Sequence, residues 1–240
     1  MSSLQGQTAL ITGGGSGIGL ACAAHLARDG AAVVLAGRSA EKLEAAAAGL
    51  RATDAEVHTV VCDVTDEAQV AAACEQAAAV GRFTMVVANA GSGSAAPLHL
   101  TTLDDWNSVM ATNLTGAFLT IKHSAVHLAR AGGGAIVAIS SIAAPRTHRY
   151  MTPYCVSKAG LEMLVQQAAD ELGSVDVHGA PERRDEAVQV GRHPAGEGPC
   201  RPAVLARVDR HPLVADGHLH ARDGLQGGGE LGDVDRGDEH

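Results

Sequence analysis

The chain has 240 residues, the usual size of one α/β domain with a well-filled core. Its net charge of −9 makes nucleic acid or an anionic membrane an unfavourable partner. The N-terminus lacks the charged and apolar regions of a leader, and no apolar run approaches the roughly 20 residues that span a bilayer. Five scattered cysteines without metal-ligand spacing fit a reducing compartment. We therefore expect a cytoplasmic protein without membrane or nucleic-acid partners.

Strand and helix patterns alternate regularly through the first 172 residues. Apolar runs predict strands near 8–12, 32–36, 57–61, 84–88 and 135–140, and helical spacing predicts helices near 17–29, 40–52, 66–79, 105–130 and 154–172. Runs such as 85–88 are apolar throughout, as in strands covered on both faces. This alternation predicts right-handed crossovers and a doubly wound parallel sheet in a single α/β domain.

A glycine-rich segment, Thr12-Gly-Gly-Gly-Ser-Gly-Ile-Gly19, stands between the first strand and the first helix. Gly13 permits a tight turn, Gly17 lets a pyrophosphate approach the backbone, and Gly19 allows close helix packing. An ordinary flexible turn is the alternative. The strand, turn and helix context favours a dinucleotide site built from Thr12, Gly13, Gly15, Ser16, Gly17, Ile18 and Gly19.

A tyrosine and a lysine stand four residues apart, at Tyr154 and Lys158, thirteen residues after Ser141. Residues four apart project from one helix face, so the ammonium can lie beside the phenol and stabilise the phenolate. Tyr154 is then a candidate acid/base. The alternative is that the two are neighbours on a solvated helix face.

With these motifs in this order, residues 4 to about 172 resemble the short-chain dehydrogenase/reductase family, which has a Rossmann-type fold. The resemblance implies a catalytic tetrad of Asn113, Ser141, Tyr154 and Lys158. It also implies that Asp63 and Val64 hold the adenine ring, and that Asn89, Ala90 and Gly91 steady the sheet beside the cofactor, where Tyr154 and Lys158 also bind. Taken alone, Asp63 could be a helix cap and Asn113 a satisfied polar residue.

The end of the second strand bears on cofactor choice. NAD-selective relatives place an acidic residue where this chain has Gly37, and Arg38 can pair with a 2′-phosphate. NADP(H) is therefore favoured, and NAD(H) is the alternative. Arg38 could instead be a solvated loop cation, and Ser16 stands where many NADP users carry a basic residue.

The segment 173–240 has a different composition. It contains no Phe, Tyr, Trp, Ile, Met, Lys, Thr or Asn and is rich in Gly, Arg, Asp, His and Pro. It is predicted to be an atypical, irregular tail that leaves the fifth strand as an unpaired edge. A shifted reading frame from about Gly179 onward would explain the change.

Two functions are compatible with this sequence. The first is an NADP-dependent oxidoreductase acting on a small alcohol or carbonyl substrate, with a pocket lined by 92–100 and 143–153. The second is a chain that binds the cofactor but is catalytically impaired. The resemblance implies a homodimer, or a homotetramer if the C-terminal region folds.

Overall fold

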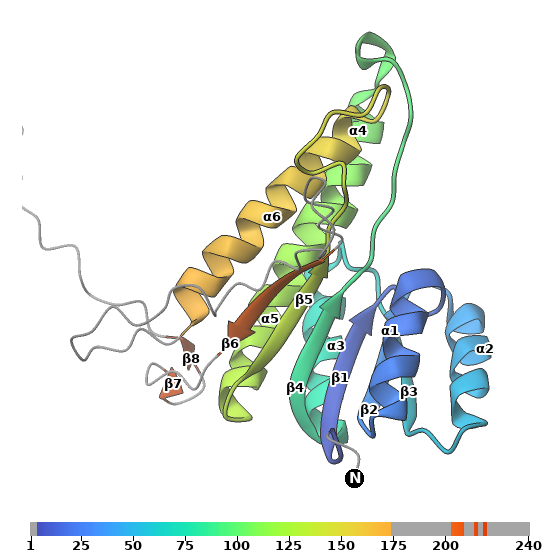
Figure 1. Ribbon diagram of the computed structural model, residues 1–240, viewed down its shortest axis with the longest axis vertical. Coiled ribbons are helices and arrows are strands. Elements are labelled where there is room, and N and C mark those ends of the chain that lie inside the picture. The colour runs from blue at the N-terminus through green and yellow to red at the C-terminus, as the bar shows by residue number, and fades with distance from the viewer. Residues whose placement is uncertain (1–3, 174–202, 209–213, 216–217, 220–240) are drawn as a thin grey trace, which may run out of the picture.

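The computed structural model describes residues 4–173, 203–208, 214–215 and 218–219 (Figure 1). A six-stranded sheet with the order β3-β2-β1-β4-β5-β6 forms its centre. The strands are β1 (Gln7–Thr12), β2 (Ala32–Gly37), β3 (Val57–Val61), β4 (Arg82–Ala88), β5 (Gly134–Ile139) and β6 (Ala203–Val208). The first five are parallel, which confirms the predicted doubly wound α/β sheet.

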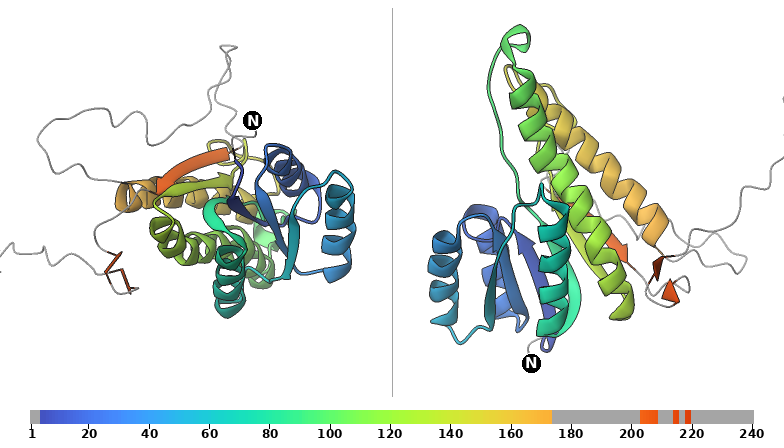
Figure 2. Two further views of the ribbon diagram at one scale, coloured as in Figure 1. Left: turned by 90° about the horizontal axis from the view of Figure 1, so that it is seen from below. Right: turned by 180° about the vertical axis from the view of Figure 1, so that it is seen from behind.

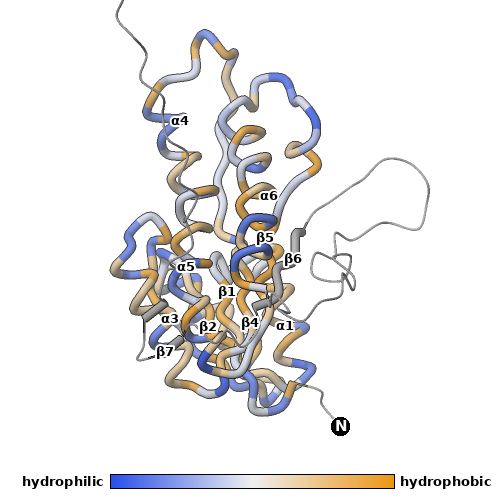
Figure 3. Tube along the Cα trace, turned by 90° about the vertical axis from the view of Figure 1, so that its left-hand side faces the viewer, coloured by the Kyte–Doolittle hydropathy of each residue, from blue (hydrophilic) through white to orange (hydrophobic). Residues whose placement is uncertain are grey.

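Helices cover both faces of this sheet (Figure 2). They are α1 (Gly17–Arg28), α2 (Ala40–Arg51), α3 (Glu67–Val80), α4 (Leu103–Met110), α5 (Gly116–Arg130) and α6 (Thr152–Leu172). Leu10 of β1 joins a core cluster with α3, α5 and α6, whereas its neighbours Ala9 and Ile11 join a cluster with α1 and α2. Side chains of a strand alternate between the two faces of the sheet, and helices cover both faces, so both sets of side chains need to be apolar. Figure 3 shows that the strands are largely hydrophobic. None of the described helices is both long and apolar enough to cross a membrane.

The strand order reverses between β1 and β4. From β1 the chain proceeds to β2 and β3 on one side, then returns to β4 on the other. In sheets of this kind a crevice opens at the reversal, beyond the carboxyl ends of the strands. The glycine-rich turn after β1 and the segment after β4 therefore meet at this crevice.

The helix predicted over 105–130 is interrupted. Helix α4 ends at Met110, a π-helical turn, η2 (Ala111–Thr115), follows, and α5 begins at Gly116. Apolar spacing does not distinguish one π turn from an α turn, so the sequence did not reveal it. Asn113, a predicted site residue, lies in this turn, and π turns are frequent at functional sites.

The prediction that β5 is an unpaired edge is wrong. Strand β6 pairs with it antiparallel, in a register that runs from Gly134 opposite Val208 to Ile139 opposite Ala203. The run Ala-Val-Leu-Ala-Arg-Val is apolar enough to add a strand, but the polar composition around it concealed this. A short hairpin of β7 (Val214–Ala215) and β8 (His218–Leu219) is also described. Most of the predicted irregular tail, including Gly179, lies outside the described residues.

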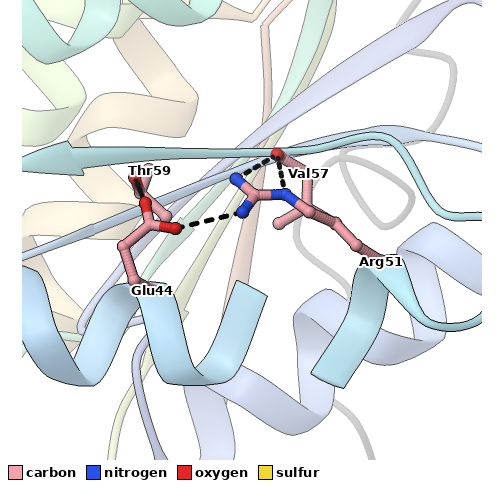
Figure 4. A network of polar contacts seen from close by, with 4 residues as sticks. All are labelled: Glu44, Arg51, Val57 and Thr59. Atoms are coloured by element: carbon pink, nitrogen blue, oxygen red, sulfur yellow. Dashed lines mark hydrogen bonds and ion pairs between the residues drawn. The ribbon is translucent and has the colours of Figure 1, made fainter. Parts of the chain in front are cut away.

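A polar network joins α2 to the edge strand β3 (Figure 4). The Glu44 carboxylate accepts a hydrogen bond from the Thr59 hydroxyl and pairs with Arg51 at 3.0 Å. Arg51 also donates to the Val57 carbonyl through Nε at 3.0 Å and Nη2 at 2.8 Å. These contacts fix α2, the helix that follows Arg38, against β3.

Candidate active site

The glycine-rich turn adopts backbone that other residues rarely adopt. Gly13 and Gly17 have φ values of 65° and 55°. A Cβ on Gly19 would lie 2.5 Å from the Gly13 carbonyl oxygen and 2.6 Å from Asn89 Nδ2, so only glycine lets α1 approach this closely. A Cβ on Gly17 would meet nothing within 4 Å, and Ser16 and Ile18 beside it are exposed. The start of α1 is thus open to an approaching group.

Thr12 and Asn89 fasten the ends of β1 and β4 to each other. The Thr12 hydroxyl oxygen accepts from the backbone N–H groups of Asn89 at 3.0 Å and Ala90 at 3.1 Å. In return, Asn89 Nδ2 donates to the carbonyls of Thr12 at 3.0 Å and Gly13 at 3.2 Å. These bonds hold the glycine-rich turn against the segment after β4, the place that the resemblance implied for Asn89.

Tyr154 and Lys158 lie together on α6. The Lys158 ammonium is 5.8 Å from the centroid of the Tyr154 ring and donates to the Ile139 carbonyl at 2.7 Å. Lys158 is only 5% exposed. Burial therefore lowers the pKa of Lys158 to about 8. The pair is not on a solvated helix face, which removes that alternative.

Asn113 holds the residues around this pair. Its Oδ1 accepts from the Ser92 N–H at 2.7 Å, and its Nδ2 donates to the Ser92 carbonyl at 2.9 Å and to Ser157 Oγ at 3.0 Å. Ser157 donates in turn to the Tyr154 carbonyl at 2.8 Å. Asn113 is thus a buried, hydrogen-bonded amide, as the alternative interpretation held, and it lies within the site. Ser157 was not predicted as a site residue, although it stands between Tyr154 and Lys158.

Two glycines bring the loop after β4 against the same side chains. A Cβ on Gly91 would lie 3.4 Å from Asn113 Oδ1 and 3.8 Å from Lys158 Nζ. A Cβ on Gly93 would lie 3.6 Å from Cδ2 of Tyr154. The structure therefore brings Gly91, Asn113, Tyr154 and Lys158 into one cluster.

Ser141 lies at the start of the loop that follows β5, directly after Ser140. Its Oγ accepts from the Ala143 N–H at 3.1 Å, which orients the hydroxyl within its own turn. The preceding Ser140 donates to Glu162 Oε1 at 2.9 Å and thereby fastens the end of β5 to α6. Ser140 and Glu162 were not predicted, because no local pattern links residues 22 positions apart.

A cleft of about 390 Å³ opens at the crevice between these elements. Six predicted residues line it: Gly13, Arg38, Asp63, Val64, Ala90 and Gly91. Gly37, which the sequence had already linked to cofactor choice, also lines the cleft. The other lining residues were not predicted: Cys62, Thr65, Ser108, Ala111 and Thr112. The open glycine cradle and this cleft fit a dinucleotide.

Asp63 is oriented at the rim of the cleft. Its Oδ1 accepts from the backbone N–H of Thr65 at 2.9 Å and from the Thr65 hydroxyl at 2.8 Å. These hydrogen bonds, together with the nearby Arg38, lower the pKa of Asp63. Asp66, not Asp63, caps α3 by accepting from the Gln69 N–H. The helix-cap alternative for Asp63 is therefore wrong.

The fold and the cleft together define a dinucleotide-binding α/β domain of the Rossmann type, because ligands of such sheets bind where the strand order reverses. The family model for short chain dehydrogenases matches residues 7–179. The chain belongs to the short-chain dehydrogenase/reductase family, a family of oxidoreductases, which confirms the resemblance found in its motifs.

Individual relatives support the same conclusion. D-threitol dehydrogenase from Mycolicibacterium smegmatis is 39% identical over 171 residues, which cover 71% of this chain and 66% of that protein. Gluconate 5-dehydrogenase from Gluconobacter oxydans is 37% identical over 174 residues, 71% of this chain and 67% of the relative. A crystal structure of gluconate 5-dehydrogenase from Burkholderia cenocepacia, in complex with NADP and tartrate, has a TM-score of 0.67 and 37% identity, and covers 70% of this chain and 66% of that one. The chain thus spans about two thirds of the length of these relatives.

Proposed function

We propose that this chain is an NADP(H)-dependent oxidoreductase acting on an alcohol or carbonyl substrate. The observation that carries this proposal is the buried ammonium of Lys158, 5.8 Å from the Tyr154 ring and bonded to the end of β5. A buried cation beside a phenol stabilises the phenolate and so makes proton exchange at Tyr154 easier.

Each catalytic residue has a separate task in this proposal. Tyr154 exchanges a proton with the substrate oxygen, and Ser141 holds that oxygen by a hydrogen bond. Lys158 stabilises the phenolate of Tyr154 and binds ribose hydroxyls. Asn113 keeps Ser92 and Ser157 in place. It would also anchor the water that carries the proton to solvent.

The cofactor, when bound, supplies or accepts the hydride. The glycine-rich turn and the start of α1 would hold its pyrophosphate, and Asp63 and Val64 its adenine ring. Arg38, on the wall of the cleft, would pair with a 2′-phosphate through charge-assisted hydrogen bonds. The gluconate 5-dehydrogenase structure that holds NADP supports NADP(H), and NAD(H) remains the alternative cofactor.

Small secondary alcohols and the corresponding ketones are the proposed substrates. The relatives are named for a polyol and a sugar acid, and segments 92–100 and 143–153 would line the pocket for such molecules. We further propose a homodimer through α5 and α6, where Phe118, Val156 and Met163 are exposed apolar side chains. A homotetramer would additionally need the C-terminal region to fold.

A second candidate is a chain that binds the cofactor without efficient turnover. It is favoured by the end of the family match at residue 179, since the remaining 61 residues of the 240-residue chain lie outside it. Thermal-shift titration with NADPH, followed by assays of NADPH consumption on a panel of ketones, separates the two candidates. Binding with turnover supports the enzyme, and binding without turnover supports the second candidate. No binding would contradict both.

A further inference from the structure

The segment that follows β4 and the segment that contains Tyr154 include no acidic residue. The chain as a whole has 27 acidic and 18 basic residues. Residues 89–103 and 140–161 nevertheless include no Asp or Glu, while the second contains Arg146, Arg149 and Lys158. These two segments therefore carry positive charge in a protein of net charge −9, although Asp104, Asp105 and Glu162 directly follow them, and a positively charged segment favours an anionic ligand.

These segments are joined at a fixed point. The Ala96 N–H donates to the Tyr150 carbonyl at 2.8 Å, and Gly93 packs against the ring of Tyr154. Tyr150 has a φ of 69°, a conformation that a residue with a side chain adopts only when its surroundings hold it there. Figure 1 shows the two segments side by side beyond the carboxyl end of the sheet. The loop after β5 is therefore positioned relative to Tyr154.

Arg149 is held within this loop. Its guanidinium lies 5.3 Å from the centroid of the Tyr150 ring, a cation–π contact that restricts the side chain. A restricted guanidinium loses less entropy when it binds a planar carboxylate through two hydrogen bonds. Arg149 is exposed, as is Arg146, so both remain accessible to a ligand.

His148, between these arginines, provides an independent indication. Its Nε2 is shielded from solvent and has no hydrogen-bond partner among the described residues. Buried polar atoms are almost always paired, so an unpaired one needs an explanation. Because this atom is shielded from solvent, a substrate oxygen would supply the missing partner only if the loop moves to admit it.

From these observations we propose that the preferred substrate is a hydroxy acid or keto acid, with its carboxylate bound by Arg149 and, more weakly, by Arg146. This proposal rests on the proposed oxidoreductase function. The carboxylate takes no part in the reaction: the alcohol carbon gives its hydride to NADP⁺, the hydroxyl proton goes to Tyr154, and the alcohol becomes a ketone. Arg149 is thus a specificity-determining residue.

Matched pairs of ketones test this proposal by binding alone. Acetoacetate, levulinate and oxocyclohexanecarboxylate are each compared with their uncharged amides, by calorimetric titration of the full chain saturated with NADP⁺. A ketone and an oxidised cofactor cannot react, so affinity is measured without turnover. At least one acid should bind about tenfold or more tightly than its amide, as expected for a hydrogen-bonded charge pair, and added salt should reduce this preference.

Variants of the loop after β5 show which arginine causes the tighter binding of acids than of amides. Arg149→Gln should remove most of it and Arg146→Gln a smaller part, while binding of the amides stays unchanged. Arg28→Gln, at the exposed end of α1, is the matched control and should alter neither. Equal binding of acids and amides, no binding of any acid, or a preference that survives both loop variants would overturn the proposal.

The outcomes for the two proposals are distinct. Turnover of neutral ketones without preference for acids would leave the oxidoreductase function standing and contradict the carboxylate site. Arginine-dependent binding of acids without turnover of any ketone would support the carboxylate site and contradict the proposed catalysis.

Discussion

The Lys158 ammonium donates a 2.7 Å hydrogen bond to the Ile139 carbonyl, the last residue of β5. Ile139 immediately precedes the pair Ser140 and Ser141, so this bond joins α6, which carries Tyr154, to the strand that leads to Ser141. One turn further along α6, Glu162 accepts from Ser140 at 2.9 Å. Two successive turns of α6 thus hold two successive residues of the chain, which fixes the approach of helix and strand.

The first prediction concerns proton transfer. Tyr154→Phe removes the hydroxyl for which we propose proton exchange but keeps the ring that lies beside Gly93. Turnover of a ketone substrate should fall by about 100-fold or more, the contribution of a general acid. The affinity for NADPH, measured by fluorescence titration, should change little. An unchanged affinity would show that the variant is folded. Turnover equal to that of the wild type would contradict the assignment.

The second prediction concerns pH and Lys158. Its pKa in the folded protein is about 8, below the value of about 10.4 for an unfolded chain. Between these values the unfolded state binds more protons, so the Lys158 contribution to the free energy of unfolding rises with pH and is lost as pH falls toward 8. Urea unfolding of the wild type and of Lys158→Met at several pH values should reveal this pH dependence of the free energy of unfolding.

Relative to Lys158→Met, the wild type should gain stability from about pH 8 to pH 10.5 and show a constant difference below that window. The same comparison with Lys42→Met, on the surface of α2, serves as the control. A difference between wild type and Lys158→Met that is constant across the whole range would show that burial does not depress the pKa of this lysine.

The third prediction concerns Arg38. Arg38→Ala should lower the affinity for NADPH by about tenfold or more, because hydrogen bonds to a charged phosphate are lost. The affinity for NADH, which has no 2′-phosphate, should remain as in the wild type. Arg28→Ala, on α1, is the control. Equal affinity of the wild type for both cofactors, unchanged in Arg38→Ala, would exclude the proposed selectivity.

The fourth prediction concerns Asn113. Asn113→Ala leaves both backbone groups of Ser92 without this partner and removes the donor to the Ser157 hydroxyl, which keeps its bond to the Tyr154 carbonyl. The free energy of unfolding should fall by about 2 kcal/mol or more, the cost of leaving buried polar groups unpaired. Asn107→Ala, at an exposed position of α4, should change it by less than about 0.5 kcal/mol. Similar losses in both variants would indicate that the hydrogen bonds of Asn113 contribute little.

The fifth prediction concerns the encoding DNA. The family match ends at residue 179, and the composition changes in the same region. If the reading frame shifts there, the adjacent frame after codon 178 should encode sequence that continues the family pattern. Sequencing the DNA tests this directly. Early stop codons in that frame would show that the C-terminal residues are a divergent part of the protein.

Local patterns were sufficient for much of the fold and for part of the site. Continuous apolar runs predicted five parallel strands, because strands covered on both faces cannot alternate with polar residues. The glycine-rich turn was predicted from its glycine spacing between a strand and a helix, and the structure gives Gly13 and Gly17 positive φ values. Tyr154 and Lys158 could be paired because helix geometry alone places residues four apart side by side.

Contacts between distant segments were decided only by the tertiary structure. The bonds between Thr12 and Asn89 span 77 positions, and the bond between Asn113 and Ser157 spans 44. No periodicity encodes such pairs, because they depend on how strands and helices stack. The pairing of β6 with β5 has the same origin, since any apolar run can add to a free strand edge. The sequence by itself therefore determined the elements and the chemistry available, whereas packing determined which side chains meet.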